Sequence, residues 1–277
     1  MQISVSSYSF SQLKKDPAEL IGLAKEMGFA AIEYIDTDLE TAYRLREESE
    51  RVGLPIIAYT VGADFLAAES IEAEAQRLCG QADIAEVLGA FVLRHDATGG
   101  FPAPYNAYNG FAQALAPLAR GCRMVTEYAA AKGIATTVEN HGFFTQDSSR
   151  LVSLVGAVNH PNFGALVDIG NFTCADEDPC KATGNLAAMA KHVHAKDFHI
   201  KPGTRDNPGE GWFQSRGGNY LRGAIIGHGD VPIRQALGNL RRAGYDGYVS
   251  IEFEGMENCL KALRIGRENL EAMLNVK

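Results

Sequence analysis

The chain has 277 residues, of which 46% are apolar and 22% charged, as is ordinary for a globular protein. Its formal net charge of −8 argues against nucleic acid as a partner, since nucleic-acid-binding proteins usually carry a basic face. No stretch approaches the roughly 18 consecutive apolar residues of a membrane span, and the N-terminus lacks the basic segment of a signal peptide. The 5 scattered cysteines form no Cys-x-x-Cys pair. We therefore expect a cytoplasmic protein with neither a disulfide framework nor a membrane partner.

Short apolar runs alternate with amphipathic segments along the whole chain. In the first helical segment, Asp16 and Pro17 form a start signal and Gly28 an end signal. Strands are expected at residues 3–8, 30–35, 54–59, 90–94, 134–138, 163–167, 192–197 and 248–253. Helices are expected at about 17–27, 39–52, 68–88, 110–132, 148–158, 186–191, 231–243 and 257–274.

This alternation predicts a parallel sheet, and its eight strand–helix units at this length match a closed (β/α)8 barrel, the TIM barrel. The competing architecture is a doubly wound open sheet. It lacks support because residues 6–10, after the first strand, contain no glycine and so no phosphate-binding fingerprint. No change in composition marks a domain boundary. We expect a single TIM-barrel domain over residues 1–277.

The least regular stretch covers about residues 200–230. It contains eight glycines and two prolines between Lys201 and Asp230, which predicts a long loop between the seventh strand and the seventh helix. Trp212 and three arginines make it more than a spacer. We expect a lid over the barrel mouth, and the alternative is a contact with a second subunit of a homo-oligomer.

Four consecutive expected strands end in side chains that bind metal ions. These residues are Glu139, Asp168, His194 and Glu252. In a TIM barrel, the C-terminal strand ends line the active site, so the four side chains should meet there. Three carboxylates and one imidazole suit Mn²⁺, Mg²⁺, Co²⁺ or Zn²⁺, and a cation would offset the cost of burying the carboxylates together. For each residue alone, a strand-end salt bridge or cap is the competing interpretation.

Several short segments carry a further signal: Val138-Glu139-Asn140-His141, Val167-Asp168-Ile169-Gly170-Asn171, Val193-His194-Ala195-Lys196-Asp197, Gly227-His228-Gly229-Asp230 and Ser250-Ile251-Glu252. In this order they resemble the xylose-isomerase-like superfamily of sugar isomerases and epimerases. The resemblance covers nearly the whole chain. It implies a TIM barrel in which Glu139, Asp168, His194 and Glu252 hold one divalent ion.

The resemblance also implies a reaction. In the ketose 3-epimerase and hydroxypyruvate isomerase branches, the residues matching Glu139 and Glu252 are the acid/base pair. Such a pair removes a proton beside a carbonyl group and returns one, while the metal stabilises the ene-diolate. We therefore expect an isomerase or epimerase of a small carbohydrate. A lyase or dehydratase that uses the same proton abstraction is the alternative.

Substrate contacts are expected from His141, Lys196 and His199. Asn171 is a further candidate, although many relatives carry histidine at this position. Because asparagine is a poor metal ligand, this difference disfavours an endonuclease IV-like hydrolase with several metal ions. A non-catalytic sugar-binding relative would be expected to lose one of the two glutamates, and this chain keeps both.

For two other residues of the expected strands, the position in the strand predicts where the side chain points. His192 is expected to face away from the barrel interior and to pack against a helix. Glu33, inside the second strand, is a candidate for the barrel lining.

Overall fold

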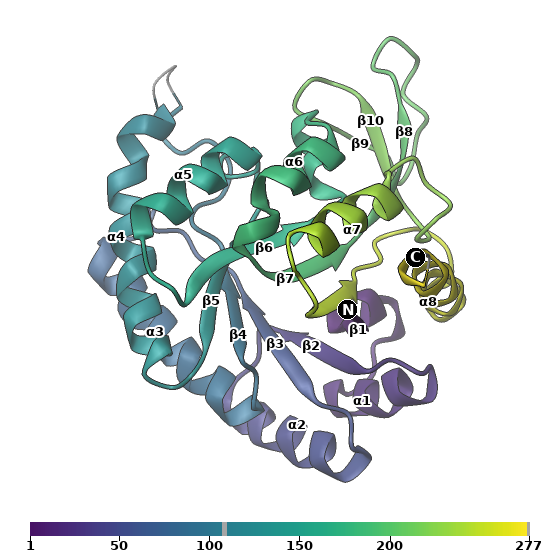
Figure 1. Cartoon of the computed structure of the whole chain (residues 1–277), viewed down its shortest axis with the longest axis horizontal. Coiled ribbons are helices and arrows are strands. Elements are labelled where there is room, and N and C mark those ends of the chain that lie inside the picture. Colours follow the sequence, from purple (N-terminus) through teal and green to yellow (C-terminus); the bar gives the residue numbers. More distant parts are fainter. Residues whose placement is uncertain (107–109, 276–277) are drawn as a thin grey trace.

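A computed structural model describes residues 1–106 and 110–275 (Figure 1). Within these residues, eight parallel strands close into a barrel in the order β1-β11-β7-β6-β5-β4-β3-β2, and helices surround it. The predicted (β/α)8 barrel is therefore confirmed. Of the expected domain 1–277, residues 107–109 and 276–277 lie outside the described part.

The barrel strands lie close to the predicted ranges. They are β1 (Gln2–Ser6), β2 (Ala31–Ile35), β3 (Ile56–Val61), β4 (Val92–His95), β5 (Ala135–Glu139), β6 (Phe163–Asp168), β7 (Ala190–Ala195) and β11 (Tyr248–Ile251). The α-helices are α1 (Pro17–Glu26), α2 (Leu39–Val52), α3 (Ile71–Leu88), α4 (Gly110–Ala130), α5 (Ser148–Val158), α6 (Pro179–Leu186), α7 (Ile233–Arg242) and α8 (Cys259–Leu274). Short 3₁₀ segments are η1 (Ser7–Leu13), η2 (Asn171–Ala175) and η3 (Ala187–Met189).

Local sequence signals explain the first helix. The Asp16 side chain accepts a hydrogen bond from the Ala18 N–H at 2.9 Å, and Pro17 occupies the first helical turn, where its missing N–H costs nothing. At the other end, Gly28 has a φ of 80°, which glycine adopts without strain.

The helix predicted at residues 186–191 is wrong in position. The structure instead has α6 at Pro179–Leu186, capped by the Asp178 side chain, which accepts from the Lys181 N–H at 2.7 Å. The start signal is the same Asp-Pro pair that opens α1, and Ala190 already belongs to β7.

The stretch at 200–230 is more regular than predicted. β8 (Asp197–Lys201), β9 (Phe213–Gln214) and β10 (Tyr220–Ala224) form a three-stranded antiparallel sheet that projects from the barrel (Figure 1). The glycine-rich composition of the stretch predicted a loop. These strands were missed because their pairing depends on contacts between distant residues rather than on local sequence. As expected, the stretch contributes no strand to the barrel.

The base of this projecting sheet is fixed by one side chain. Asp197 accepts hydrogen bonds from the backbone N–H groups of Gly227, Gly229 and Val231 at 2.8, 3.0 and 3.1 Å. A Cβ at Gly229 would lie 2.2 Å from the Asp197 carboxylate, so a residue larger than glycine would collide with it. The stretch thus returns to the end of β7, where it began.

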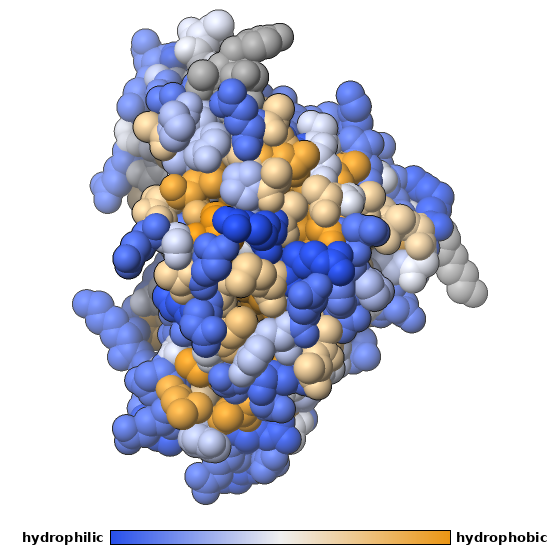
Figure 2. Space-filling view, turned by 90° about the vertical axis from the view of Figure 1, so that its left-hand side faces the viewer, coloured by the Kyte–Doolittle hydropathy of each residue, from blue (hydrophilic) through white to orange (hydrophobic). Residues whose placement is uncertain are grey.

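The outside of the barrel is covered by helices of mixed surface character. On the face that carries α3 and α4, apolar areas alternate with hydrophilic ones (Figure 2). None of the helices in the described part of the chain is long and apolar enough to cross a membrane.

Candidate metal centre and active site

The four predicted metal ligands lie together at the C-terminal ends of their strands. Glu139 ends β5, Asp168 ends β6, His194 lies in β7 and Glu252 follows β11. One donor atom from each lies within 4.8 Å of the others. Asp168 and His194 are partners in the register of β6 and β7, so the sheet itself sets their spacing.

Two of these side chains have buried atoms that lack a hydrogen-bond partner among the described residues. They are Asp168 Oδ2 and His194 Nδ1, which lie 3.8 Å apart. Asp168 Oδ2 also lies 3.3 Å from Lys196 Nζ, so His194 Nδ1 is the atom left without a partner among the described residues. Leaving a buried polar atom unpaired is costly, and a cation between the two atoms would satisfy it. The donor set of three carboxylates and one imidazole therefore fits a divalent ion.

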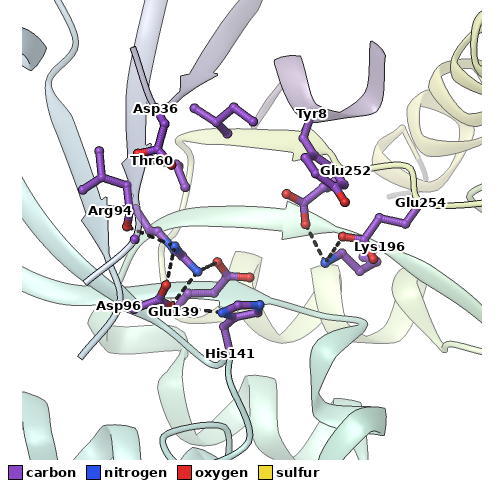
Figure 3. Close-up of a pocket in the computed structure, with 13 residues that line it drawn as sticks. Tyr8, Asp36, Thr60, Arg94, Asp96, Glu139, His141, Lys196, Glu252 and Glu254 are labelled. Carbon is purple, nitrogen blue, oxygen red and sulfur yellow. Dashed lines mark hydrogen bonds and ion pairs between the residues drawn. The ribbon is translucent and has the colours of Figure 1, made fainter. Parts of the chain in front are cut away.

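Two buried cations flank the cluster on opposite sides (Figure 3). Arg94 Nη2 lies 2.6 Å from Glu139 Oε2 and 2.9 Å from Asp96 Oδ1. Lys196 Nζ lies 2.5 Å from Glu252 Oε2 and 3.2 Å from Glu254 Oε1. Each of the two expected acid/base carboxylates thus has its own positively charged partner.

These contacts determine which forms of the buried groups are stable. Burial alone would lower the pKa of Lys196, but the surrounding carboxylates, Asp168 first, raise it well above its usual value. Burial would raise the pKa of Glu252, but Lys196 and His194 lower it well below its usual value. For Asp168 burial dominates and raises the pKa to about 6.

A cavity of about 290 Å³ lies against this cluster. This volume is at the lower end of the range for small-molecule sites. Besides the groups already described, its walls include Tyr8, Asp36, Thr60 and His141 (Figure 3). The lining is rich in polar atoms, which suits a substrate with several oxygens.

The four candidate substrate residues fall into three positions. His141 and Lys196 line the cavity. Asn171 lies behind it, where its Nδ2 donates to Glu139 Oε1 at 2.8 Å and its Oδ1 accepts from Lys196 at 3.2 Å. His199 does not line the cavity, because β8 carries it into the projecting sheet opposite Arg222. His141 and Lys196 are therefore placed at the cavity and His199 is not, and the substrate contacts of all four residues stay predictions.

Sequence reasoning missed Arg94 as part of the site. Its signal was an arginine in a short, buried strand directly after Val92 and Leu93, where a charged side chain requires a partner. The neighbouring His95 packs edge-on against Phe65, and its Nδ1 donates to the Asp96 backbone carbonyl at 2.8 Å.

The prediction for His192 is wrong. Side chains alternate between the two faces of a strand, so residues two apart, such as His192 and His194, share a face. His192 points into the barrel, where its Nε2 lies 2.6 Å from Glu33 Oε2. Glu33 is fully buried and lies inside the barrel, as its sequence position suggested.

A closed barrel with three carboxylates and one imidazole at its C-terminal strand ends defines a TIM-barrel protein with a candidate metal centre. The chain belongs to the xylose isomerase-like TIM barrel family, whose model matches residues 21–275. This confirms the resemblance seen in the sequence motifs.

Solved structures of the same fold include proteins with different activities. The probable 3-DHS dehydratase AsbF from Bacillus anthracis, involved in petrobactin synthesis, is 20% identical, with a TM-score of 0.75 and 100% of both chains covered. The 3-keto-D-glucoside 4-epimerase YcjR from E. coli is 15% identical, with a TM-score of 0.72 and 100% of both chains covered. A xylose isomerase-like TIM barrel protein from Mycobacterium smegmatis, in complex with magnesium, is 15% identical, with a TM-score of 0.74; 98% of this chain and 96% of that one are covered.

At these identities the likeness establishes the fold. None of the curated proteins matches the chain in sequence.

Proposed function

We propose that the protein is a divalent-metal-dependent isomerase or epimerase of a small ketose or a related carbohydrate. The observation that carries this proposal is the pair of carboxylates, Glu139 and Glu252, at one small polar cavity, each held by a different cation. Two such groups on either side of a substrate can take a proton from one face of a carbon and return one to the other.

Glu139, Asp168, His194 and Glu252 would hold the ion. When bound, the ion supplies a Lewis acid that stabilises negative charge on the substrate oxygens. One glutamate removes the proton from the carbon next to the carbonyl group, which leaves the ene-diolate. For epimerisation, the other glutamate would enter the cycle protonated and give this proton to the opposite face. For isomerisation, the first glutamate would return its proton to the neighbouring carbon while a hydroxyl proton moves between the two oxygens.

The neighbouring side chains keep the acid/base pair in place. Arg94 and Asn171 donate to different oxygens of Glu139, so its carboxylate is fixed in orientation. Asp36, Thr60 and His141 on the cavity walls are available to hydrogen-bond substrate hydroxyl groups. This supports a polyhydroxylated substrate of a few carbons rather than an apolar one.

The test is a panel of free ketoses incubated in deuterated water with protein and Mn²⁺ and followed by NMR. We expect exchange of one specific C–H and formation of an isomer, with neither in the Glu252→Gln variant. If no sugar exchanges a C–H although the protein carries its full metal content, the proposal is wrong.

A dehydratase is the second candidate, and Lys196 is the observation that favours it. Its ammonium group lies at the cavity, 2.5 Å from Glu252, and can protonate a leaving hydroxyl group after Glu252 removes the α-proton. The same NMR samples distinguish the two reactions, because loss of water yields a conjugated product that absorbs in the ultraviolet.

A further inference from the structure

A buried chain of polar side chains crosses the barrel interior and reaches the candidate metal ligands at His194. It consists of Glu33 from β2, His192 and His194 from β7, Ser250 from β11 and Ser4 from β1. All are at most 1% exposed, in a region that TIM barrels usually fill with apolar side chains. Such a polar chain needs a physical explanation.

The Glu33 carboxylate is at the centre of this chain. Its Oε2 accepts hydrogen bonds from both His194 Nε2, at 3.0 Å, and His192 Nε2, at 2.6 Å, while its Oε1 lies 2.8 Å from His194 Nε2. His192 Nε2 is in turn 3.2 Å from Ser250 Oγ, which is 2.7 Å from Ser4 Oγ. One carboxylate therefore binds both histidines of β7, and the serines extend the chain to β1.

The distances identify hydrogen bonds rather than a second metal site. Glu33, His192 and His194 are near enough to share an ion in principle. However, ligands at about 2.0–2.1 Å from a tetrahedral ion lie roughly 3.3 Å apart. The 2.6 Å between Glu33 Oε2 and His192 Nε2 is too short for that and is typical of a strong hydrogen bond to a charged acceptor.

We propose that Glu33 is a positioning residue for the metal centre: it accepts the Nε2–H of His194 and so directs the lone pair of Nδ1 toward the metal ligands. His194 Nδ1 has no hydrogen-bond partner among the described residues and lies 3.6 Å from Glu252 Oε2. A carboxylate behind a ligating imidazole fixes its tautomer and ring orientation and makes it a better ligand.

His192 has a supporting part in this arrangement. Because its hydrogen bond holds Glu33 Oε2, the carboxylate cannot rotate away from His194. The inference rests on the metal centre of the proposed function, but not on its substrate.

The experiment measures Mn²⁺ affinity directly, from the EPR signal of the free ion during titration of metal-free protein. Glu33→Gln keeps the size of the side chain but weakens the acceptor, and we expect affinity to fall about 10- to 100-fold. The matched control is Ser4→Ala, which removes a hydrogen bond in the same layer without touching His194. We expect its affinity to stay within about twofold of the wild type. Unchanged affinity in folded Glu33→Gln would overturn the proposal.

A double-mutant cycle separates positioning from simple charge attraction. In the His194→Ala background, Glu33→Gln should cause no further loss of affinity, because Glu33 acts through His194. An equal loss in that background would mean that Glu33 attracts the cation as a distant charge, and the proposal would fail.

A measurement on the wild type covers the case in which Glu33→Gln does not fold. Nitrogen-15 NMR of the Zn²⁺-loaded protein should show His194 with metal on Nδ1 and a proton on Nε2. Metal on Nε2 would overturn the proposal. If these results hold but no sugar exchanges a proton, the proposed reaction is wrong and the role of Glu33 stands. If a sugar exchanges a proton but Glu33→Gln leaves metal affinity unchanged, the reaction stands and the role of Glu33 is wrong.

Discussion

Each side of the cavity pairs one buried cation with one of the two acid/base glutamates, but the two ion pairs are built differently. On the β4–β5 side, the Arg94 guanidinium binds Glu139 and Asp96 together, and all its neighbours are at least four-fifths buried. On the β7–β11 side, a single ammonium, Lys196, is shared by Glu252, Glu254 and Asp168, and Glu254 is 32% exposed. Arginine stays charged and presents a fixed fork, whereas lysine is flexible and able to release a proton. The first side is therefore a fixed and enclosed ion pair, whereas the second is shared and partly exposed, and its carboxylates hold the pKa of Lys196 well above its usual value.

The largest effect is expected from the acid/base carboxylates. Glu252→Gln and Glu139→Gln should each lower kcat by about 10²–10⁴-fold, measured with enough added metal to restore full occupancy. Normal turnover in either metal-loaded variant would show that the carboxylate on that side of the cavity is only a ligand.

One metal ion is expected to bind ligands from both sides of the cavity, Glu139 and Glu252, together with Asp168 and His194 between them. Purified protein should contain one divalent ion per chain by elemental analysis, and His194→Ala should lower its metal occupancy sharply. Affinity should also weaken as pH falls through about 6, the pKa to which burial raises Asp168, because protons then compete with the metal for this carboxylate. Two or three ions per chain would contradict a single shared centre.

Replacing each cation by the other residue type tests the comparison between the two sides directly. Lys196→Arg retains the charge but not the ability to give up a proton, and we expect kcat to fall by about 10-fold or more with metal content unchanged. Activity equal to wild type would mean that Lys196 is only a counter-ion.

Arg94→Lys should act differently. It loses the guanidinium group that binds Glu139 and Asp96 together, so metal affinity and kcat should fall together.

The smallest effect is expected from the projecting sheet. No residue of the fully described stretch 200–230 lines the cavity, so its predicted action as a lid stays a prediction. Arg216 ties the sheet to the loop after β5 through Asp147, at 2.9 and 3.0 Å, and the Phe143 carbonyl, at 3.1 Å. If this contact helps to close the site, Arg216→Ala should lower kcat/KM about threefold without changing metal content. The conservative Arg216→Lys should retain part of the effect, and unchanged kinetics in both would exclude the lid.

The sequence predicted the barrel and the ligand positions because both depend on a repeated local pattern. Each apolar run that ends in a carboxylate or imidazole is visible on its own, and the barrel topology then brings Glu139, Asp168, His194 and Glu252 to one edge. Contacts between different strands were much harder to predict. That Arg94 belongs with Glu139, or Glu33 with His194, depends on which strands are neighbours and how far each side chain reaches across the barrel.

The remaining errors have separate causes. The strands β8, β9 and β10 are short and lie in a glycine-rich stretch, so only their mutual pairing marks them. The error at His192 came from applying the two-residue period of a strand incorrectly. The displaced α6 came from overlooking Asp178 and Pro179, although the same signal was used correctly for α1.

The hydrogen bonds of Asp197 have a consequence for how this barrel tolerates change. Because this side chain closes the base of the stretch between β8 and α7, the segment beyond it is a loop whose ends are already held together. Doubling the length of such a loop costs only about 0.6 kcal/mol in closure entropy. Insertions and deletions around residues 203–212 should therefore leave the barrel intact. Over evolutionary time, the chain is free to reshape this outer segment while Asp197, Gly229 and the strand ends below stay the same.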